Sequence, residues 1–324
     1  MQPRITTVIP VYNGREFILQ ALESVARQTL QTDRLIILDD CSTDGIGQVV
    51  KEFRALPFEW VRNEKNLGLF GNANRALQYS AETDYLHFLH QDDVIQPRFY
   101  EIMTQQLDSC DGYGMAYCLD ERIDENNQRL SMSGKASGKI EEKDKDEFLC
   151  RKAEIANQAW SGTLLKTRYQ KPACLFRLDM PILGDMVFWA EWGKHCRKIV
   201  QVHQPLCQYR WHGTNATTAA APGIQAMILD EWRTMEMNEA LRDRGWSLFR
   251  KLKLKGLFAV RSGIKAKRFR TRQNNPRYSD EIVRAAKGIT GTPLWLLAQV
   301  LVELRDLVVY TILRRPQHAK NVYS

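Results

Sequence analysis

YLHFLHQDD, residues 85–93, is an apolar run that leads directly into two adjacent carboxylates. Its apolar side chains predict a buried strand. Two neighbouring carboxylates repel each other unless a cation compensates them, and Mg²⁺ and Mn²⁺ prefer carboxylate and phosphate oxygens. Because open α/β sheets bind ligands at the carboxyl ends of their strands, this stretch predicts a cation site at Asp92 and Asp93. The alternative is an acidic turn that only closes the strand.

The residues before this stretch alternate apolar runs with helical patterns. Strands and helices are expected in turn at residues 5–10, 15–28, 35–38, 42–53, 58–61, 68–79 and 85–89. Repeated βα units with short connections predict a mainly parallel, doubly wound sheet flanked by helices. Residues 95–215 indicate mixed α and β structure, with a polar hairpin or loop at 120–147 and closing strands at 199–202 and 208–211. Dinucleotide and P-loop glycine motifs are absent from the sequence, so neither chemistry is indicated.

The composition is that of a globular protein in a reducing compartment. Apolar residues make up 44% of the 324 residues and charged residues 26%, which is ordinary for a globular chain. The seven cysteines are odd in number and contain no C-x-x-C pair, which disfavours a disulfide framework and a zinc ribbon. A strand pattern begins within a few residues of Met1, so we expect no signal peptide and a cytoplasmic location.

The net charge of +8 conceals two parts of opposite sign. Residues 241–324 contain 19 Lys and Arg residues against five Asp and Glu residues, a balance of +14. Residues 1–240 contain 27 against 33, a balance of −6. Parts of such different charge usually have different partners. We therefore expect one α/β domain at residues 1–220 and a helical, basic and amphipathic region at residues 221–324.

Several blocks of the expected α/β domain resemble the motifs of the family 2 glycosyltransferases, which have the GT-A fold. The blocks occur in the family's order and at its usual spacing over roughly residues 5–215, and the basic tail is left uncovered. They are VIPVYN at 8–13, LIILDDCSTDG at 35–45, the segment 62–74, Gln91-Asp92-Asp93, Gly184-Asp185 and YRWHG at 209–213. Each block alone is a weak signal, whereas the six together are specific.

The resemblance implies a role for each matching residue. It assigns Pro10, Tyr12, Asp40, Asn74 and Asp92 to the nucleotide, Asp93 and His212 to the metal ion, Arg210 to the diphosphate or acceptor side, and Asp185 to general base catalysis. Asp40 would accept a hydrogen bond from the base, and Asp92 would contact the ribose or the metal shell. Trp160 would form an acceptor-side wall, although core packing explains it equally well. His87 and His90 flank an apolar strand, and we interpret both as structural.

The same residues also have structural interpretations. Asp40 and Asp185 each precede or begin a helical pattern, where a carboxylate caps backbone N–H groups. His212, taken alone, resembles an ordinary surface histidine. The aromatic face of residues 186–192, however, would partly desolvate Asp185 and raise its pKa, which suits a general base.

The implied activity is metal-dependent, inverting transfer of one sugar from a nucleotide sugar, UDP-linked in most members, to a glycan or lipid-linked glycan in cell-surface polysaccharide biosynthesis. Mn²⁺ or Mg²⁺ would be the cofactor. The Q-x-x-R-W signature of processive synthases is absent, so we expect addition of single sugars. One alternative is a catalytically silent GT-A protein whose tail recruits assembly partners. Another is a nucleotidyltransferase, which residues 11–15 support poorly because they contain one glycine, one arginine and no lysine.

The C-terminal tail has the pattern of a membrane-surface segment. Residues 249–272 interleave basic and apolar side chains, and the apolar residues 293–313 are interrupted by Gln299, Glu303 and Asp306. Central charges cost about 2.5–3.5 kcal/mol each in a spanning helix, whereas polar residues on one face suit a helix in the bilayer interface. We therefore expect peripheral attachment to the anionic inner face of the cell membrane. Packing on the catalytic domain or in a homo-oligomer is the alternative, and nucleic-acid binding is disfavoured because no such module is present.

Overall fold

The computed structural model describes residues 4–156, 158–213, 223–243, 247–271 and 273–306. Contacts divide the chain into two compact units, Met1–Ala220 and Ala221–Ser324. The expected domain boundary at residues 220 and 221 lies outside the described residues, so the functional division of the chain stays a prediction. The end of the expected apolar segment, residues 307–313, also lies outside them.

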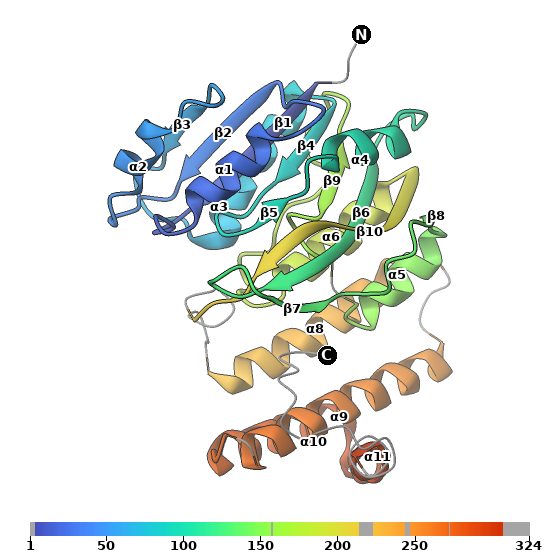
Figure 1. The fold of residues 1–324 in the computed structure, drawn as a ribbon. Helices are drawn as coiled ribbons and strands as arrows, with labels where there is room; N and C mark the ends of the chain where they lie inside the picture. The colour runs from blue at the N-terminus through green and yellow to red at the C-terminus, as the bar shows by residue number, and fades with distance from the viewer. Residues whose placement is uncertain (1–3, 157, 214–222, 244–246, 272, 307–324) are drawn as a thin grey trace. The chain divides into compact units, whose positions relative to one another are not determined.

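A ten-stranded mixed sheet forms the centre of the first unit (Figure 1). Its strands follow the order β3-β2-β1-β4-β9-β6-β10-β5, while β7 pairs with β6 and β8 with β10. The strands are β1 Ile5–Val11, β2 Arg34–Asp39, β3 Glu59–Arg62, β4 Tyr85–Phe88, β5 Val94–Ile95, β6 Gly114–Ile123, β7 Arg129–Met132, β8 Ile140–Glu142, β9 Thr163–Lys166 and β10 Lys198–Arg210.

The long strands of this sheet are mainly parallel, which confirms the predicted fold class. β1 is parallel to β2 and β4, β2 to β3, and β6 to β10. β9 lies between β4 and β6 and is antiparallel to both. The carboxyl ends of β1, β2, β4, β6 and β10 therefore share one edge of the sheet. Because β9 runs the other way, the residues that precede it lie at this same edge.

Helices flank the sheet (Figure 1). They are α1 Ile18–Ala26, α2 Ile46–Glu52, α3 Gly68–Ala76 with the 3₁₀ helix Leu77–Glu82, α4 Phe99–Leu107, α5 Lys145–Ala153 and α6 Gly184–His195. Both β1 and β4 are buried along their whole length. A strand covered on both faces needs no polar alternation, which explains why the sequence shows uninterrupted apolar runs there.

Two parts of the first unit differ from the sequence-based expectation. β10 is one strand of 13 residues rather than two, because register shifts between Val202 and Cys207 interrupt its pairing with β6 without ending it. The segment 120–147 contains the predicted hairpin, in which the end of β6 pairs with β7 in antiparallel orientation, and in addition β8 and the start of α5, which were not expected. The Asp144 side chain caps α5 by accepting a hydrogen bond from Glu147 N at 2.9 Å.

The second unit is helical in its described part. It contains α8 Ile224–Ala240, α9 Leu248–Thr271, α10 Pro276–Thr290 and α11 Thr292–Asp306. α9 packs against α10 and α11, and α8 packs against α10. Buried ion pairs neutralise part of its basic charge, because Glu231 binds Arg261 and Lys265, and the buried Glu239 binds two arginines in the same way.

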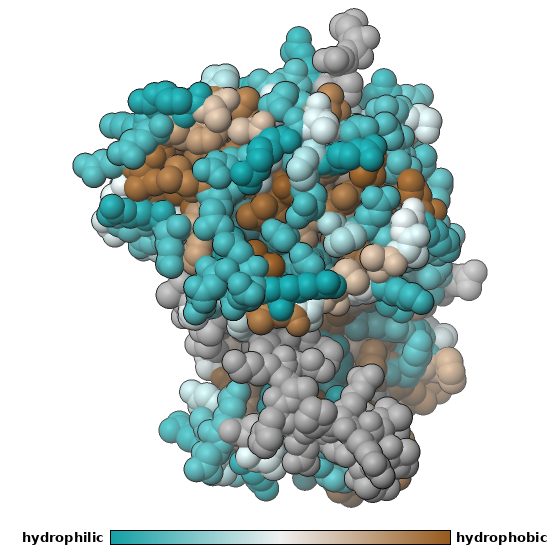
Figure 2. Space-filling model, viewed as in Figure 1, coloured by the Kyte–Doolittle hydropathy of each residue, from teal (hydrophilic) through white to brown (hydrophobic). Residues whose placement is uncertain are grey.

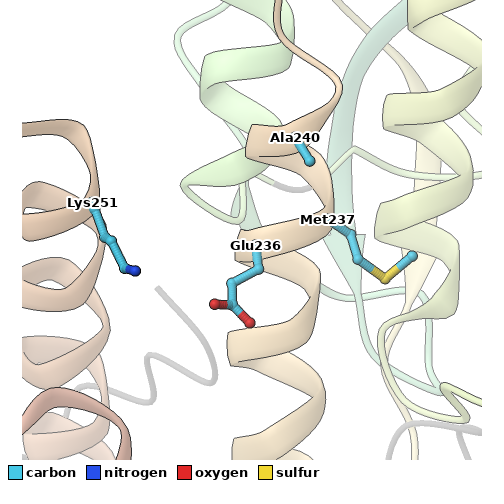
Figure 3. A pocket seen from close by; sticks show the side chains of 4 residues that line it. All are labelled: Glu236, Met237, Ala240 and Lys251. Atoms are coloured by element: carbon cyan, nitrogen blue, oxygen red, sulfur yellow. The ribbon is translucent and has the colours of Figure 1, made fainter. Parts of the chain in front are cut away.

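Hydrophilic residues dominate the visible face of the first unit, with separate hydrophobic areas between them (Figure 2). In the second unit, an open hollow between α8 and α9 is lined by Glu236, Met237, Ala240 and Lys251 (Figure 3). None of these four residues belongs to the site predicted from the sequence. Within the described residues, no helix has both the length and the apolar character needed to cross a bilayer.

Candidate active site

The carboxyl edge of the sheet brings together the loops that follow β1, β2 and β4. In the parallel register, Val11 lies opposite Asp39, and Val8 lies opposite Phe88. Arg210, the last residue of β10, lies at the same edge because β10 runs parallel to β6. The motifs that the sequence places far apart therefore meet along one edge.

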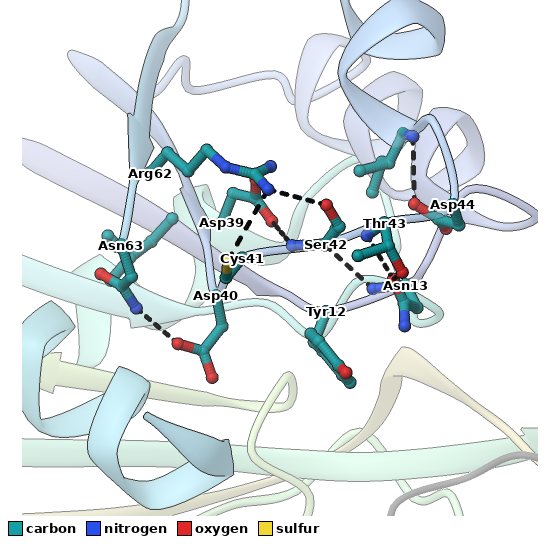
Figure 4. Close-up of polar contacts among 12 residues, drawn as sticks. Tyr12, Asn13, Asp39, Asp40, Cys41, Ser42, Thr43, Asp44, Arg62 and Asn63 are labelled. Carbon is teal, nitrogen blue, oxygen red and sulfur yellow. Dashed lines mark hydrogen bonds and ion pairs between the residues drawn. The ribbon is translucent and has the colours of Figure 1, made fainter. Parts of the chain in front are cut away.

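Asp40 lies buried directly after β2. Its Oδ1 accepts hydrogen bonds from Asn63 Nδ2 at 2.6 Å and from Leu67 N at 2.8 Å. The side chain of Tyr12 is exposed beside this segment (Figure 4). Pro10 is buried within β1. The protein thus fixes Asp40 through one carboxylate oxygen. The nucleotide-binding roles of Asp40, Tyr12 and Pro10 stay predictions.

Polar contacts hold the loops after β1 and β2 against each other (Figure 4). Asp39 is fully buried, pairs with Arg62 and accepts a hydrogen bond from Ser42 N at 2.9 Å. Asn13 N donates to Ser42 Oγ at 3.0 Å. Asn13 and Cys41 have φ angles of 50° and 68°, in a region that non-glycine residues seldom adopt and that is concentrated at functional sites.

Gln91 connects the loop after β1 to the loop after β4. Its Oε1 accepts a hydrogen bond from Tyr12 N at 2.9 Å, and its Nε2 donates to Tyr12 O at 3.2 Å. Gly14 leaves room for this side chain, because a Cβ at that position would lie 2.1 Å from Gln91 Oε1. The two hydrogen bonds fix the acidic loop relative to the loop of Tyr12.

Asp92 and Asp93 lie in different surroundings although they are adjacent in sequence. Asp92 Oδ2 pairs with His212 Nε2 at 2.9 Å. Asp93 is 1% exposed, and its two oxygens accept hydrogen bonds from Ser161 Oγ at 2.6 Å and Arg210 N at 2.9 Å. Burial, and then repulsion from Asp92, raises the pKa of Asp93 well above its usual range. A bound cation would offset both effects.

His90 belongs to this acidic group, which the sequence-based interpretation missed. Single ligand atoms of His90, Asp92 and Asp93 lie within 4.8 Å of one another. Burial lowers the pKa of His90, so its ring is neutral, and its buried Nε2 has no hydrogen-bond partner among the described residues. Two carboxylates and a neutral imidazole form a donor set that fits a divalent ion. His87, in contrast, is fully buried with both ring nitrogens hydrogen-bonded, as the structural interpretation predicts.

Arg210 does not face an open diphosphate site, which corrects the sequence-based expectation. Its side chain is fully buried and lies 4.7 Å from the centre of the Phe17 ring. Its guanidinium donates hydrogen bonds of 2.8–3.0 Å to Asp92 O, Asp124 O, Asn127 Oδ1 and Gln20 Oε1. Because protein groups occupy these donors, Arg210 joins α1, the loop after β4 and the turn after β6.

Asp185 lies in the first turn of α6 and is bound by Trp160. The indole Nε1 donates to Asp185 Oδ2 at 3.0 Å. Burial raises the pKa of Asp185, although the Trp160 hydrogen bond and the backbone N–H of Met186 oppose this. The predicted desolvation of this carboxyl is thus confirmed. Gly184 permits the close packing here, because a Cβ would lie 2.7 Å from Arg177 O.

Trp160 and Asn74 are both engaged by protein contacts. The buried Trp160 ring stacks on Phe176 and packs against His90, with centroid distances of 4.6 and 4.9 Å. The Trp160 ring is therefore packed in the core, while its indole N–H donates a hydrogen bond to Asp185. The Asn74 amide exchanges hydrogen bonds of 2.9 and 2.7 Å with the backbone of Phe176. A direct contact between Asn74 and a nucleotide stays a prediction.

Lys152 of α5 is a buried cation that no sequence pattern singles out. It is 3% exposed, and its Nζ donates to Ala156 O at 2.9 Å. Burial lowers the pKa of Lys152 to about 7, while the charge of Asp185 acts in the opposite direction. Lys152 lies in a helix that packs against α6, and the sequence of α5 alone does not specify this packing.

The fold defines the class of the protein. The crystal structure of Staphylococcus aureus TarS 1-349 in complex with UDP-GlcNAc matches 96% of this chain and 88% of the TarS chain, with a TM-score of 0.63 and 16% sequence identity. The chain therefore has the GT-A fold of that protein.

Sequence comparison identifies the family. The glycosyl transferase family 2 profile matches residues 6–165. Glycosyltransferase GlyA of Streptococcus pneumoniae serotype 4 is 29% identical over 105 residues, which cover 32% of this chain and 15% of GlyA. The putative teichuronic acid biosynthesis glycosyltransferase TuaG of Bacillus subtilis is 33% identical over 94 residues, which cover 28% of this chain and 37% of TuaG. The matches thus span well under two thirds of these relatives. Residues 6–165 of the chain are thus similar to glycosyl transferase family 2.

Proposed function

We propose that this protein transfers single sugars from a nucleotide sugar to a hydroxyl group of a glycan or lipid-linked glycan, with inversion at the transferred carbon. The observation that supports this most is the shared sheet edge, where Asp40, the Asp92–Asp93 pair and the base candidate Asp185 come together. TarS binds UDP-GlcNAc in its crystal structure, which supports UDP as the nucleotide here. The role ascribed to TuaG supports a place in cell-surface polysaccharide biosynthesis.

The acidic group would serve the donor. Asp40, Tyr12 and Pro10 would receive the base, and Asp92 would contact the ribose or the metal shell. Asp93, with the ring nitrogens of the neighbouring histidines 90 and 212, would hold Mn²⁺ or Mg²⁺. A divalent ion bound there would neutralise the charge that develops on the departing diphosphate.

Asp185 would serve the acceptor as general base. It would take the proton of the acceptor hydroxyl while that oxygen forms a bond to the sugar carbon. The bond between this carbon and the diphosphate oxygen would break, and its electron pair would leave with the diphosphate. A general base is most effective when its pKa lies near the working pH. Burial raises the pKa of Asp185 and so moves it toward that pH.

Asp185→Asn tests this assignment. An asparagine retains an oxygen for the Trp160 indole, so we expect a folded protein that binds nucleotide sugar and Mn²⁺ as the parent does in thermal-shift titrations. Turnover, followed by release of the nucleoside diphosphate, should fall by about 10²–10⁴-fold. Because burial raises the pKa of Asp185, the acid limb of the parent's kcat/KM should lie above the pKa of about 3.9 of a free aspartate.

A matched control is Asp179→Asn. Asp179 is an exposed acid five positions before Gly184, and it pairs with Arg177. Its replacement should leave turnover unchanged. Undiminished turnover in Asp185→Asn would remove Asp185 from the mechanism. A parent protein that binds nucleotide sugars but transfers none would instead support a silent binding protein.

We also propose that the second unit attaches the enzyme to the inner face of the cell membrane. Glu303 and Asp306, which the sequence places on one face of the helix, bind Lys267 of α9 at 2.8 and 2.9 Å, and the Glu303 side chain stays 69% exposed. α11 also presents aliphatic side chains that are 50–59% exposed, namely Leu296, Leu297, Val300, Leu301 and Leu304. Exposed aliphatic side chains on a helix of a strongly basic region fit an anionic bilayer surface.

A further inference from the structure

The turn at residues 159–163, which leads into β9, carries two side chains that bind two acids of the site. Trp160 donates its indole N–H to Asp185 Oδ2 at 3.0 Å. The next residue, Ser161, donates its hydroxyl to Asp93 Oδ2 at 2.6 Å. One short turn therefore contacts both the proposed general base and a proposed metal ligand.

Several hydrogen bonds fix the backbone of this turn. Thr163 N donates to Trp160 O at 2.9 Å, and Thr163 Oγ1 donates to Ala159 O at 2.8 Å. The buried His87 contacts the turn as well, because its Nε2 lies 3.0 Å from Ser161 O. A carbonyl oxygen only accepts, so this ring nitrogen carries the proton and donates it. The main chain that bears Trp160 is therefore anchored within the sheet.

The indole ring of Trp160 is held on several sides. It is 7% exposed and stacks on Phe176, with a centroid distance of 4.6 Å and an interplanar angle of 19°. Phe88 and Trp189 pack against it in T-shaped contacts at 6.1 and 6.0 Å, an arrangement that aromatic pairs favour. Because these contacts fix the plane of the ring, they also fix the direction in which its N–H points.

The indole nitrogen can act only as a hydrogen-bond donor. The Oδ2 atom of Asp185 must therefore direct a lone pair toward Trp160, both when the carboxyl is ionised and after it has taken a proton. Asp185 is half-buried, whereas its neighbours Gly184 and Met186 are buried, so the residue is still within reach of solvent. With Oδ2 engaged by the indole, a proton from outside is received more readily at Oδ1.

We propose that Trp160 is a positioning residue for the general base: its indole N–H holds Asp185 Oδ2, so that the carboxyl presents Oδ1 to the proton of the acceptor hydroxyl. This inference rests on the proposed role of Asp185. The proton passes from the hydroxyl to Oδ1 while the hydroxyl oxygen bonds to the sugar carbon and the diphosphate leaves with its electron pair. Trp160 keeps its own proton and stays hydrogen-bonded to Oδ2 throughout.

Trp160→Phe and Trp160→His together test the inference, because they separate the N–H group from the bulk of the ring. Phenylalanine keeps a six-membered aromatic ring without a donor, whereas Nε2 of histidine can take the place of the indole N–H. Trp160→Phe should lower kcat by about 10–10²-fold, the loss that misplacement by ~1 Å can cause, with KM for the nucleotide sugar and Mn²⁺ affinity as in the parent. Trp160→His, assayed at pH 8 where its imidazole is neutral, should recover most of that loss although it removes more apolar surface.

The matched control is Trp192→Phe. Trp192 is fully buried in α6, and its indole N–H donates to a backbone carbonyl, Gly114 O, at 3.4 Å. This change removes the same atoms and one indole hydrogen bond, so Tm should fall while kcat stays at the parent value. An equal fall of kcat in Trp192→Phe, or no recovery in Trp160→His, overturns the inference.

The roles of Trp160 and Asp185 can fail separately. Unchanged kcat in Trp160→Phe, together with loss of turnover in Asp185→Asn, would refute the positioning role and leave the base in place. Full turnover in Asp185→Asn would instead refute the proposed base itself, and the positioning role with it.

A measurement on the tryptophan signals covers the case in which neither Trp160 variant folds. The chain has eight tryptophans, whose indole N–H groups are followed by ¹H–¹⁵N NMR. A hydrogen bond to a carboxylate moves an indole proton downfield, so Asp185→Ala should move one of these signals strongly upfield, while Asp179→Asn should move none. If no indole signal moved in Asp185→Ala, Trp160 would not hold the carboxylate in solution and the inference would be wrong.

Discussion

The two carboxylates after β4 differ because the backbone turns between them. Asp93 points under the sheet edge, where Ser161 Oγ and the backbone N–H of Arg210 bind its oxygens. Asp92 stays nearer the surface and pairs with His212. Since burial raises the pKa of Asp93, a bound cation would stabilise the ionised form of this carboxyl more than that of Asp92. We therefore expect Asp93 to have the larger effect on metal affinity.

Asp93→Asn should weaken Mn²⁺ binding in the presence of UDP by at least tenfold, the loss that even indirect partners of a metal commonly cause. Asparagine can still accept from Arg210 N, so the fold should persist. Isothermal titration calorimetry measures the dissociation constant. Asp84→Asn is the control, because Asp84 lies at the opposite end of β4 and accepts from Arg4 N at 3.1 Å. Equal Mn²⁺ affinity in the parent and Asp93→Asn would exclude Asp93 as a metal ligand.

Residue types and their spacing predicted which acids would form the site, but not how each is oriented. The pattern around Asp92 and Asp93 marked a cation site, and the aromatic residues after Asp185 marked a desolvated carboxyl. The place of His90 in the acidic group was not predicted, because a histidine beside an apolar strand resembles a core residue. His87 is such a core residue. The orientation of a ring depends on the opposing element, which the local sequence does not specify.

At the scale of elements, Arg210 connects segments that the sheet alone would leave independent. Its guanidinium binds α1, the loop after β4 and the turn after β6. Lysine at this position keeps the charge but cannot reproduce the planar fork of donors. Each buried acceptor left without a partner costs about 1–3 kcal/mol.

Arg210→Lys should therefore lower the free energy of unfolding by about 3–5 kcal/mol, measured by urea denaturation. Arg129→Lys provides the comparison, because Arg129 is exposed and pairs with Glu121 at 2.9 Å, and its change should stay within about 0.5 kcal/mol. If Arg210→Lys lowered the free energy of unfolding by less than about 1 kcal/mol, the hydrogen bonds of the Arg210 guanidinium would not be stabilising.

The repeated βα pattern predicted the first four strands and their parallel pairing, and the structure confirms that pairing. The direction of β9 was not predictable in this way. The residue pattern of an apolar strand does not indicate its direction in the sheet. The antiparallel direction of β9 is seen only in its pairing with β4 and β6. That reversal carries Trp160 and Ser161 to the site, so their contacts with Asp185 and Asp93 had no signal in the sequence.

At the scale of the whole molecule, the charge difference between the two parts of the chain has a structural counterpart. The first unit carries the acidic edge that would bind a cation and diphosphate. In the second unit, buried acids pair with some of the basic residues, while α11 leaves an aliphatic face exposed. An amphipathic sequence predicted a surface helix, but not that Glu303 and Asp306 would pair with Lys267 of α9.

If this face contacts lipid, Leu297→Asp combined with Leu301→Asp should abolish most membrane association of the full-length protein. Both side chains lie on the exposed side of α11, 59% and 50% exposed. Burial of one leucine contributes about 1.5–3 kcal/mol, so the double change should reduce flotation with phosphatidylglycerol-containing vesicles by at least tenfold. Leu130→Asp, on β7 and 52% exposed, should float as the parent does.

The lipid composition and the oligomeric state separate the two possible occupants of α11's aliphatic face. Contact with an anionic bilayer predicts that the parent floats poorly with neutral vesicles and that salt weakens its association, because basic side chains near an anionic surface contribute about 1 kcal/mol each and are screened within about 10 Å at 0.1 M salt. Light scattering of the parent and the double variant measures self-association. A parent dimer that the double variant converts to monomer, with flotation unchanged, would assign this face to a second copy of the chain instead of to lipid.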